Sequence, residues 1–133
     1  MEISTADKLK KYAPVVVRIG LALVFLWFSS QQLLHTDQWI RLIPEWATSL
    51  SGLSAAALVK FNGIFELIFG TALLLGFFTR IVSGFLALHM LHIMFTVGYG
   101  GIGVRDFGLA MATISVFLHG VDAWCLDKHL KKH

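Results

Sequence analysis

The stretch LVKFNGIFELIFGTALLLGFF, residues 58–78, decides the fold class because it is long and apolar enough to cross a membrane. A helix needs about 20 such residues to span a hydrocarbon core of about 30 Å. Glu66 lies near the middle of this stretch. A charged side chain at mid-bilayer costs on the order of 3 kcal/mol, so acids at this depth usually face the protein interior and have a partner. We therefore expect Glu66 to mark a polar site inside a membrane protein.

The composition of the whole chain agrees with this interpretation. Of its 133 residues 56% are hydrophobic and 14% are charged, whereas a soluble domain carries about 25% charged residues. The net charge of +3 arises from basic residues near the termini, and no basic and aromatic residues alternate as nucleic-acid binding would require. Cys125 is the only cysteine, which excludes an intrachain disulfide and an iron–sulfur motif, and we expect a buried or interfacial thiol.

Three further apolar stretches, residues 14–34, 81–99 and 104–121, have the length of a span. All four should be helices, because lipid cannot satisfy free backbone groups. The sequence thus predicts an all-α, four-helix membrane domain over residues 14–121, after a polar N-terminus (1–13) and before a basic tail (122–133). The first stretch lacks a small-residue cleavage site, which favours a span over a signal peptide. The short connection at residues 79–80 predicts a tight antiparallel hairpin of spans two and three.

The distribution of basic residues predicts the orientation. With four spans, one side of the membrane carries both termini and the basic residues Lys8, Lys10, Lys11, Arg18, Arg80, Lys128, Lys131 and Lys132. The other side carries Arg41, Lys60 and Arg105. The positive-inside rule then places both termini in the cytoplasm.

The outer connection, residues 35–57, contains Trp39 and Trp46 and is expected to lie at the membrane interface. One interpretation is an anchor at headgroup level, which we favour because tryptophan is generally enriched there. The other is a lid over the outer mouth of the bundle.

Polar and small residues recur along each span at alternating steps of three and four, which places them on one helix face. Such residues belong at helix contacts in lipid, so we expect these faces to meet in a polar seam. The predicted faces are Arg18, Ala22, Phe25, Ser29 and Gln32; Asn62, Glu66 and Phe69 or Gly70; Phe85, His89, His92, Thr96 and Tyr99; and Arg105, Gly108, Ala112, Ser115 and His119.

Depth along the helices suggests a pocket that opens outward. Counted from the outer helix ends, Glu66, His92 and His89 lie about 12, 10 and 15 Å deep. We expect these three to exchange protons, as catalytic residues. Asn62, Gln32, Arg105 and Asp106 lie nearer the outer surface and are expected to bind substrate. Arg18 lies near the cytoplasmic end, about 10 Å from the level of Glu66, and is assigned a structural or gating role with Trp39 and Trp46.

Other interpretations of these groups stay open. A neutral Glu66–His92 hydrogen bond would merely fix helix register. A metal site of His89, His92 and Glu66 is chemically reasonable but less favoured, and we assign no metal ligand. Haem is disfavoured because His89 and His119 differ in depth by about 6 Å.

Several short motifs together resemble the DoxX family of small four-helix membrane proteins. They are Val17–Arg18–Ile19–Gly20, Asn62–Gly63–Ile64–Phe65–Glu66, Gly70, Leu74–Leu75–Gly76, Thr79–Arg80, Val104–Arg105–Asp106–Phe107–Gly108–Leu109 and Trp124–Cys125–Leu126–Asp127. The resemblance implies a multi-pass protein of a bacterial or archaeal inner membrane with an acid on span two. The family name comes from the membrane subunit of a thiosulfate:quinone oxidoreductase, and other members act in redox and sulfur-stress complexes or as assembly factors.

Two functions follow as hypotheses. The first is a membrane subunit of a quinone-linked redox system, which uses the Glu/His pocket and works in the lipid bilayer with partner redox proteins or as a homo-oligomer. The second is a non-catalytic assembly or scaffold subunit, which the lack of a cysteine pair or haem motif favours. Small-molecule transport is a weaker third hypothesis, because no internal repeat is evident.

Overall fold

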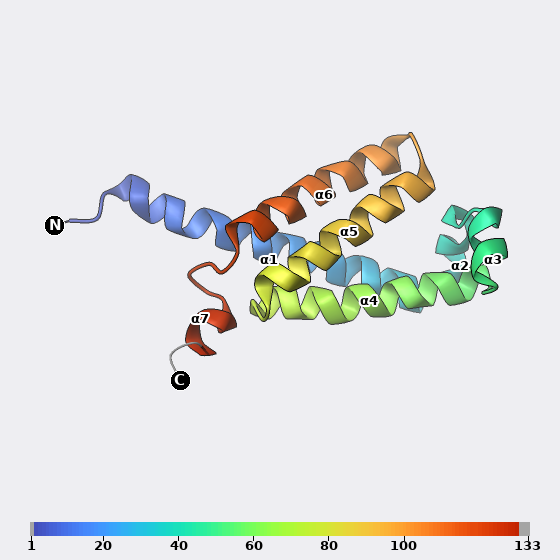
Figure 1. The fold of residues 1–133 in the computed structure, drawn as a ribbon, viewed down its shortest axis with the longest axis horizontal. Helices are drawn as coiled ribbons and strands as arrows, with labels where there is room; N and C mark the ends of the chain where they lie inside the picture. Colours follow the sequence, from blue (N-terminus) through green and yellow to red (C-terminus); the bar gives the residue numbers. More distant parts are fainter. Residues whose placement is uncertain (1, 131–133) are drawn as a thin grey trace.

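The computed structural model describes residues 2–130, and its elements are all helical (Figure 1). Lys131, Lys132 and His133, which belong to the predicted basic tail, lie outside the described residues. In chain order the elements are α1 (Thr5–Leu34), α2 (Thr36–Trp39), the 3-10 helix η1 (Ile40–Leu42), α3 (Glu45–Ser51), α4 (Ala55–Leu75), α5 (Thr79–Val97), α6 (Gly101–His119) and α7 (Leu126–Leu130).

Within residues 2–130, four helices are long and apolar enough to cross a membrane: α1, α4, α5 and α6. The predicted all-α, four-span architecture is therefore confirmed. The last three spans each begin and end two or three residues before the predicted positions.

The first helix begins much earlier than its apolar stretch. Ser4 caps α1, since its hydroxyl accepts a hydrogen bond from the backbone N–H of Asp7 at 3.2 Å. Pro14 consequently lies inside α1 and not at its start. The polar residues that precede Pro14 are helical and exposed, and in Figure 1 they extend beyond the other long helices.

The long helices associate as two pairs. Helix α1 packs extensively against α4, and α5 packs extensively against α6, whereas the contacts between the two pairs are sparser. The predicted tight hairpin of spans two and three is only partly correct. Helices α4 and α5 meet at their connecting turn but diverge toward the opposite end (Figure 1).

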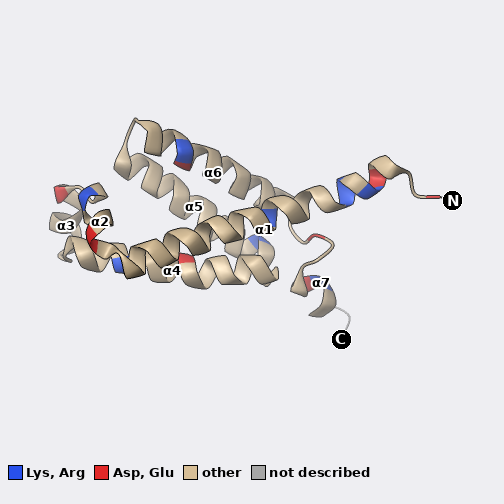
Figure 2. Ribbon diagram, turned by 180° about the vertical axis from the view of Figure 1, so that it is seen from behind, with Lys and Arg blue, Asp and Glu red and all other residues tan. Residues whose placement is uncertain are grey.

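We call the end of the bundle near the chain termini the terminal end. The opposite end, which carries α2, η1, α3 and the α5–α6 turn, is the distal end (Figure 1). Seen from behind in Figure 2, the long helices bear few charged residues, and a cluster of charges lies at the start of α1.

The predicted polar face of α1 is buried in full, from Arg18 to Gln32. The predicted faces of α5 and α6 are largely wrong, although His89 does contact Glu66. On α5 the buried residues include Leu86 and Met90, while Phe85, His92 and Tyr99 are exposed. On α6 the buried face contains Asp106, Ala110 and Thr113 in place of Arg105, Gly108, Ala112, Ser115 and His119. These helices pack mainly against each other, and their buried faces combine apolar residues with small polar ones such as Ser83 and Thr113.

A buried ion pair joins the first helix to the chain after α6 at the terminal end. Arg18 Nε donates to Asp122 Oδ2 at 2.6 Å, and both side chains are 1% exposed. Arg18 Nη1 also donates to the carbonyl oxygens of Leu73 and Leu74, at 2.9 and 2.7 Å. These carbonyls close α4, and a cation at a helix C-terminus is favourable. Arg18 thus has a structural position far from the distal end.

The pKa of Asp122 reflects two opposing effects. Burial acts to raise this pKa, but the hydrogen bond and charge of Arg18 and the hydrogen bond from the Trp124 N–H more than offset burial. The pKa of the Asp122 carboxyl is therefore lowered from its ordinary value of 3.8.

Asp127 caps the start of α5. Its carboxylate accepts hydrogen bonds from the backbone N–H groups of Phe78 and Thr79, at 2.7 and 2.8 Å, and from the Thr79 hydroxyl. Phe78 has a left-handed backbone with φ of 48°, which is costly for a bulky residue and which this capping helps to hold.

Cys125 packs against the turn between α4 and α5, fully buried as expected from the sequence. It lies so close to Gly76 that a Cβ there would be 2.5 Å from the Cys125 Cα atom. Residues 122–127 are therefore part of the packed structure and not a solvated tail.

Candidate functional site

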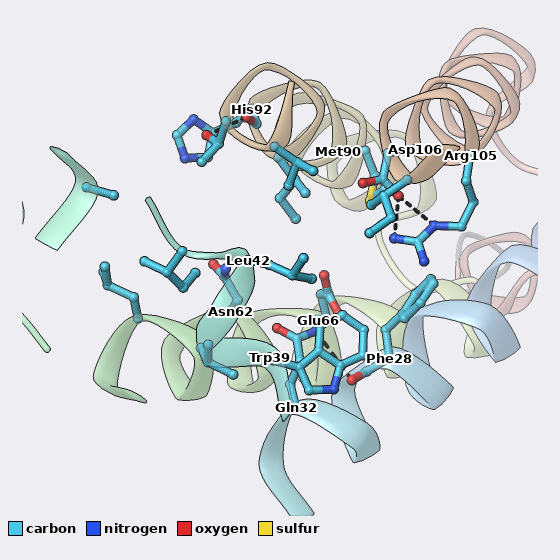
Figure 3. Close-up of a pocket in the computed structure, with 18 residues that line it drawn as sticks. Phe28, Gln32, Trp39, Leu42, Asn62, Glu66, Met90, His92, Arg105 and Asp106 are labelled. Atoms are coloured by element: carbon cyan, nitrogen blue, oxygen red, sulfur yellow. Dashed lines mark hydrogen bonds and ion pairs between the residues drawn. The ribbon is translucent and has the colours of Figure 1, made fainter. Parts of the chain in front are cut away.

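A cavity of about 140 Å³ lies at the distal end, where the two helix pairs diverge (Figure 3). We call it the distal cavity. Its lining residues come from every distal element: Phe28, Gln32, Trp39, Leu42, Ile43, Ala47, Leu58, Val59, Asn62, Glu66, Met90, His92, Ile93, Thr96, Val97, Ile102, Arg105 and Asp106. Most are apolar, so the cavity suits a ligand with an apolar body and a few polar atoms.

Glu66 is held by two partners on different helices. Its Oε2 atom accepts a hydrogen bond from Gln32 Nε2 of α1 at 2.7 Å, and its Oε1 atom lies 3.1 Å from His89 Nε2 of α5. The Glu66 residue is only 2% exposed. The carboxyl group thus links both helix pairs at the base of the cavity.

Two glycines explain why Gln32 can reach Glu66. Gly63 and Gly70 flank Glu66 on the buried face of α4. A Cβ at Gly63 would lie 3.0 Å from the Leu33 side chain, and one at Gly70 would lie 3.2 Å from Phe25 Cβ. Ser29 Oγ donates to the Gly63 carbonyl at 2.8 Å. Small residues therefore bring α1 and α4 close together, as in other membrane helix pairs.

His89 contacts Glu66 but does not line the cavity, among the described residues. Its imidazole packs on the Phe65 ring with centroids 4.6 Å apart, and its side chain is 11% exposed. Glu66 therefore connects the cavity with a histidine outside it.

The alternative prediction of a Glu66–His92 hydrogen bond is wrong, because His89 is the histidine that contacts Glu66. His92 is exposed, and Figure 3 shows its ring directed away from Glu66. Three residues advance a helix by about 300°, so the direction of His92 falls about 60° short of a full turn from that of His89. The expected trio of Glu66, His89 and His92 does not converge, and within residues 2–130 no group of three metal-ligand side chains is found.

Arg105 and Asp106 form the wall contributed by α6. Arg105 Nε and Nη2 lie 2.9 and 2.8 Å from Asp106 Oδ1, and the guanidinium carbon lies 4.7 Å from the centre of the Phe28 ring. Asp106 is 1% exposed, and its Oδ2 atom has no hydrogen-bond partner within residues 2–130.

The segment between α1 and α4 covers part of the cavity. Trp39, Leu42 and Ala47 line it, and the Trp39 ring meets the Phe28 ring edge to face at 5.8 Å. This is the arrangement expected of a lid. Trp46 does not line the cavity and is 53% exposed, as an interfacial anchor would be.

Sequence reasoning placed Gln32, Asn62, Glu66, Arg105 and Asp106 near one pocket, and all five line the distal cavity. It missed the acid that neutralises Arg18. A usable signal existed, since a buried Arg at one end of a span requires an acid at the same level. Asp122, the residue directly after the predicted end of span four, satisfies that requirement.

The DoxX family model matches residues 13–99, from α1 through α5. No curated protein and no solved structure matches the chain. Since the match covers well over half of a chain with four candidate spans, the chain belongs to the DoxX family and is a membrane protein.

Proposed function

We propose that this chain is a membrane subunit of a quinone-linked redox system and that the distal cavity receives the quinone ring. The observation that carries the proposal is the position of Glu66, which lies between a mostly apolar cavity and His89. Ionisable groups within membrane spans usually serve a function, and this one has access to a ligand site.

The size and lining of the cavity support a ring-shaped ligand. An engineered apolar cavity of about 150 Å³ in another protein binds benzene, and the distal cavity has a similar volume of about 140 Å³. Phe28 and Trp39 supply aromatic surface, while Asn62 and Glu66 supply hydrogen-bonding atoms. A substituted quinone ring would then place its oxygens against these polar groups and its alkyl chain toward lipid.

Quinone reduction consumes two protons and two electrons. Glu66 is placed to give or take a proton at a ring oxygen, and His89 is placed to exchange that proton with Glu66 through the Oε1–Nε2 contact of 3.1 Å. We assign the electrons to a reduced sulfur compound or a partner redox protein. Arg105, whose side chain is 42% exposed at the distal end, would attract an anionic donor.

The proposed setting is a cell membrane of a bacterium or archaeon, with both chain termini in the cytoplasm and the distal cavity at the outer face. The basic residues of the terminal end support this orientation.

Binding of a short-chain quinone to the purified protein in lipid nanodiscs tests the proposal. Isothermal titration calorimetry in two buffers of different ionisation enthalpy gives both the affinity and the number of protons exchanged. We expect saturable binding with net proton exchange in the wild type. We expect no proton exchange in Glu66→Gln, because the amide can keep contacts to Gln32 and His89 but cannot titrate.

Lys60→Gln is the matched control, since it removes one charge from an exposed position on the same helix. Its affinity for the quinone and the number of protons exchanged should equal those of the wild type. A wild type that binds no quinone, or a Glu66→Gln variant with unchanged affinity and proton exchange, would contradict the proposed function and leave the assembly role as the better explanation.

A further inference from the structure

One carboxylate oxygen of Asp106, a residue that lines the distal cavity, lacks a hydrogen-bond partner among residues 2–130. Arg105 occupies only Oδ1 of this carboxylate, through both Nε and Nη2. Oδ2 is buried without a hydrogen-bond partner among residues 2–130, and Asp106 lines the cavity. Buried polar atoms are nearly always paired, and an exception calls for an explanation.

The chemistry of that oxygen restricts the group that can satisfy it. Arg105 forms an ion pair with this carboxylate through Oδ1. The other oxygen, Oδ2, therefore carries part of the negative charge and can accept a hydrogen bond. It therefore calls for a hydrogen-bond donor on the ligand. A quinone carbonyl is itself an acceptor and would be repelled, whereas the hydroxyl of a reduced ring donates.

The cavity presents a second acceptor on another wall. Glu66 comes from α4 and Asp106 from α6, and Figure 3 shows the two side chains reaching the cavity from opposite sides. The oxygens of Glu66 have their own partners, Gln32 and His89, so Asp106 carries the unused hydrogen-bonding capacity. A reduced ring has hydroxyl groups at opposite edges, which matches acceptors on opposite walls.

We propose that Asp106 Oδ2 accepts a hydrogen bond from a ring hydroxyl, and that the distal cavity consequently binds the reduced quinol more tightly than the quinone. This inference rests on the proposed function, because it assumes a quinone-type ligand. It adds a residue that selects between the two redox forms of that ligand.

Such selectivity has a consequence for electron transfer. A hydrogen bond to a charged group justifies a preference of about tenfold. For a two-electron couple, tenfold tighter binding of the reduced form raises the potential of the bound ligand by about 30 mV. The bound quinone would then be a better acceptor for a weakly reducing donor.

Three short-chain ligands test the inference: the quinone, the corresponding quinol, and the dimethyl ether of that quinol, which keeps the ring but lacks donors. Each is titrated anaerobically into the nanodisc-embedded protein. We expect the wild type to bind the quinol about tenfold more tightly than either other ligand. In Asp106→Asn an amide N–H faces the cavity, and we expect the preference for the quinol over the quinone to be lost or inverted.

The outcomes separate this inference from the proposed function. Equal binding of quinol and quinone by the wild type would overturn the inference while the proposed function stands. Binding of none of the three would overturn both. Equal binding of the quinol and its dimethyl ether would show that no hydroxyl is recognised and would also overturn the inference. The wild-type ligand series decides the question even if Asp106→Asn fails to fold.

Discussion

Both ends of the bundle bury charged side chains, but the two ends differ in whether those side chains have partners for all of their polar atoms. At the terminal end Arg18 forms contacts with Asp122 and with two helix-closing carbonyls, and Asp127 accepts three hydrogen bonds from Phe78 and Thr79. At the distal end Glu66 and Asp106 border a cavity, and one Asp106 oxygen has no hydrogen-bond partner in the described part of the chain.

This difference distinguishes buried charges that stabilise the fold from buried charges that can bind a ligand. A buried ion pair whose atoms are all used fixes the position of the helices but leaves nothing to bind a ligand. A buried carboxylate with free hydrogen-bonding capacity costs stability unless a ligand completes it. We therefore assign the terminal cluster to folding and the distal cavity to binding.

The largest expected effect concerns the terminal ion pair. Arg18→Met leaves Asp122 as an unpaired buried charge, and removing one member of such a pair costs about 3–5 kcal/mol. The free energy of unfolding, measured by SDS titration in mixed micelles, should fall by this amount. Any variant that remains folded should bind quinone as the wild type does.

A double variant is the control for this prediction. Arg18→Met combined with Asp122→Leu removes both charges and should regain most of the lost stability, because apolar replacement of a buried pair is often neutral. If the double variant were as unstable as Arg18→Met alone, the pair would not be the source of the effect.

The two histidines of α5 provide the next test. His89→Gln removes the imidazole that contacts Glu66, and the proton exchange measured on quinone binding should fall to near zero with an affinity loss of about tenfold. His92→Gln changes a cavity-lining side chain that does not contact Glu66, and it should leave the proton exchange unchanged. The reverse result, a loss in His92→Gln alone, would refute the assigned proton route.

A smaller effect is expected at the cap of α5. Asp127→Ala removes the acceptor for the first N–H groups of this helix, which should lower the free energy of unfolding by about 1 kcal/mol. The same SDS titration measures it, with Lys128→Ala as the adjacent control. An unchanged stability would mean that the cap contributes nothing to the fold.

The smallest effect is a dependence of the free energy of unfolding on pH in the acidic range. Because the folded-state pKa of Asp122 is lowered from 3.8, its contribution is present above that value and is lost as the pH falls through the folded-state pKa. Asp122→Asn should be less stable at pH 7 and should lack this acid-dependent part. The comparison requires unfolding curves from pH 7 to pH 3. If the stability of Asp122→Asn depended on pH as that of the wild type does, the assigned role of the Asp122 carboxylate would be contradicted.

The sequence predicted the spans and the polar face of α1 because these depend on local properties, namely length, hydropathy and the need of Arg18 and Gln32 for partners. It could not predict the packing faces of α5 and α6. In lipid, a Leu at a helix contact and a Leu facing acyl chains are equivalent in sequence, so Leu86 and Met90 gave no signal. Gly108 and Ser115, which suggested a contact, lie on exposed surface.

The candidate site could likewise be predicted only in part from the sequence. Glu66 was predictable as a buried acid, but the choice between His89 and His92 depends on a rotation of about 60° around α5. The packing of α5 on α6 sets that rotation. The role of residues 122–127 was missed because this segment was assigned to the basic tail, although Asp122 and Cys125 are buried.

Photolabelling tests the central claim most directly. A short-chain quinone carrying a photoreactive group on its ring is crosslinked to the protein in nanodiscs, with and without excess unlabelled quinone, and the labelled residues are mapped by mass spectrometry. The account predicts competed labels on distal-cavity residues, above all Trp39, Leu42 and Asn62. Competed labels near Arg18 and Asp122, or labels spread over lipid-facing residues that excess quinone does not reduce, would contradict it.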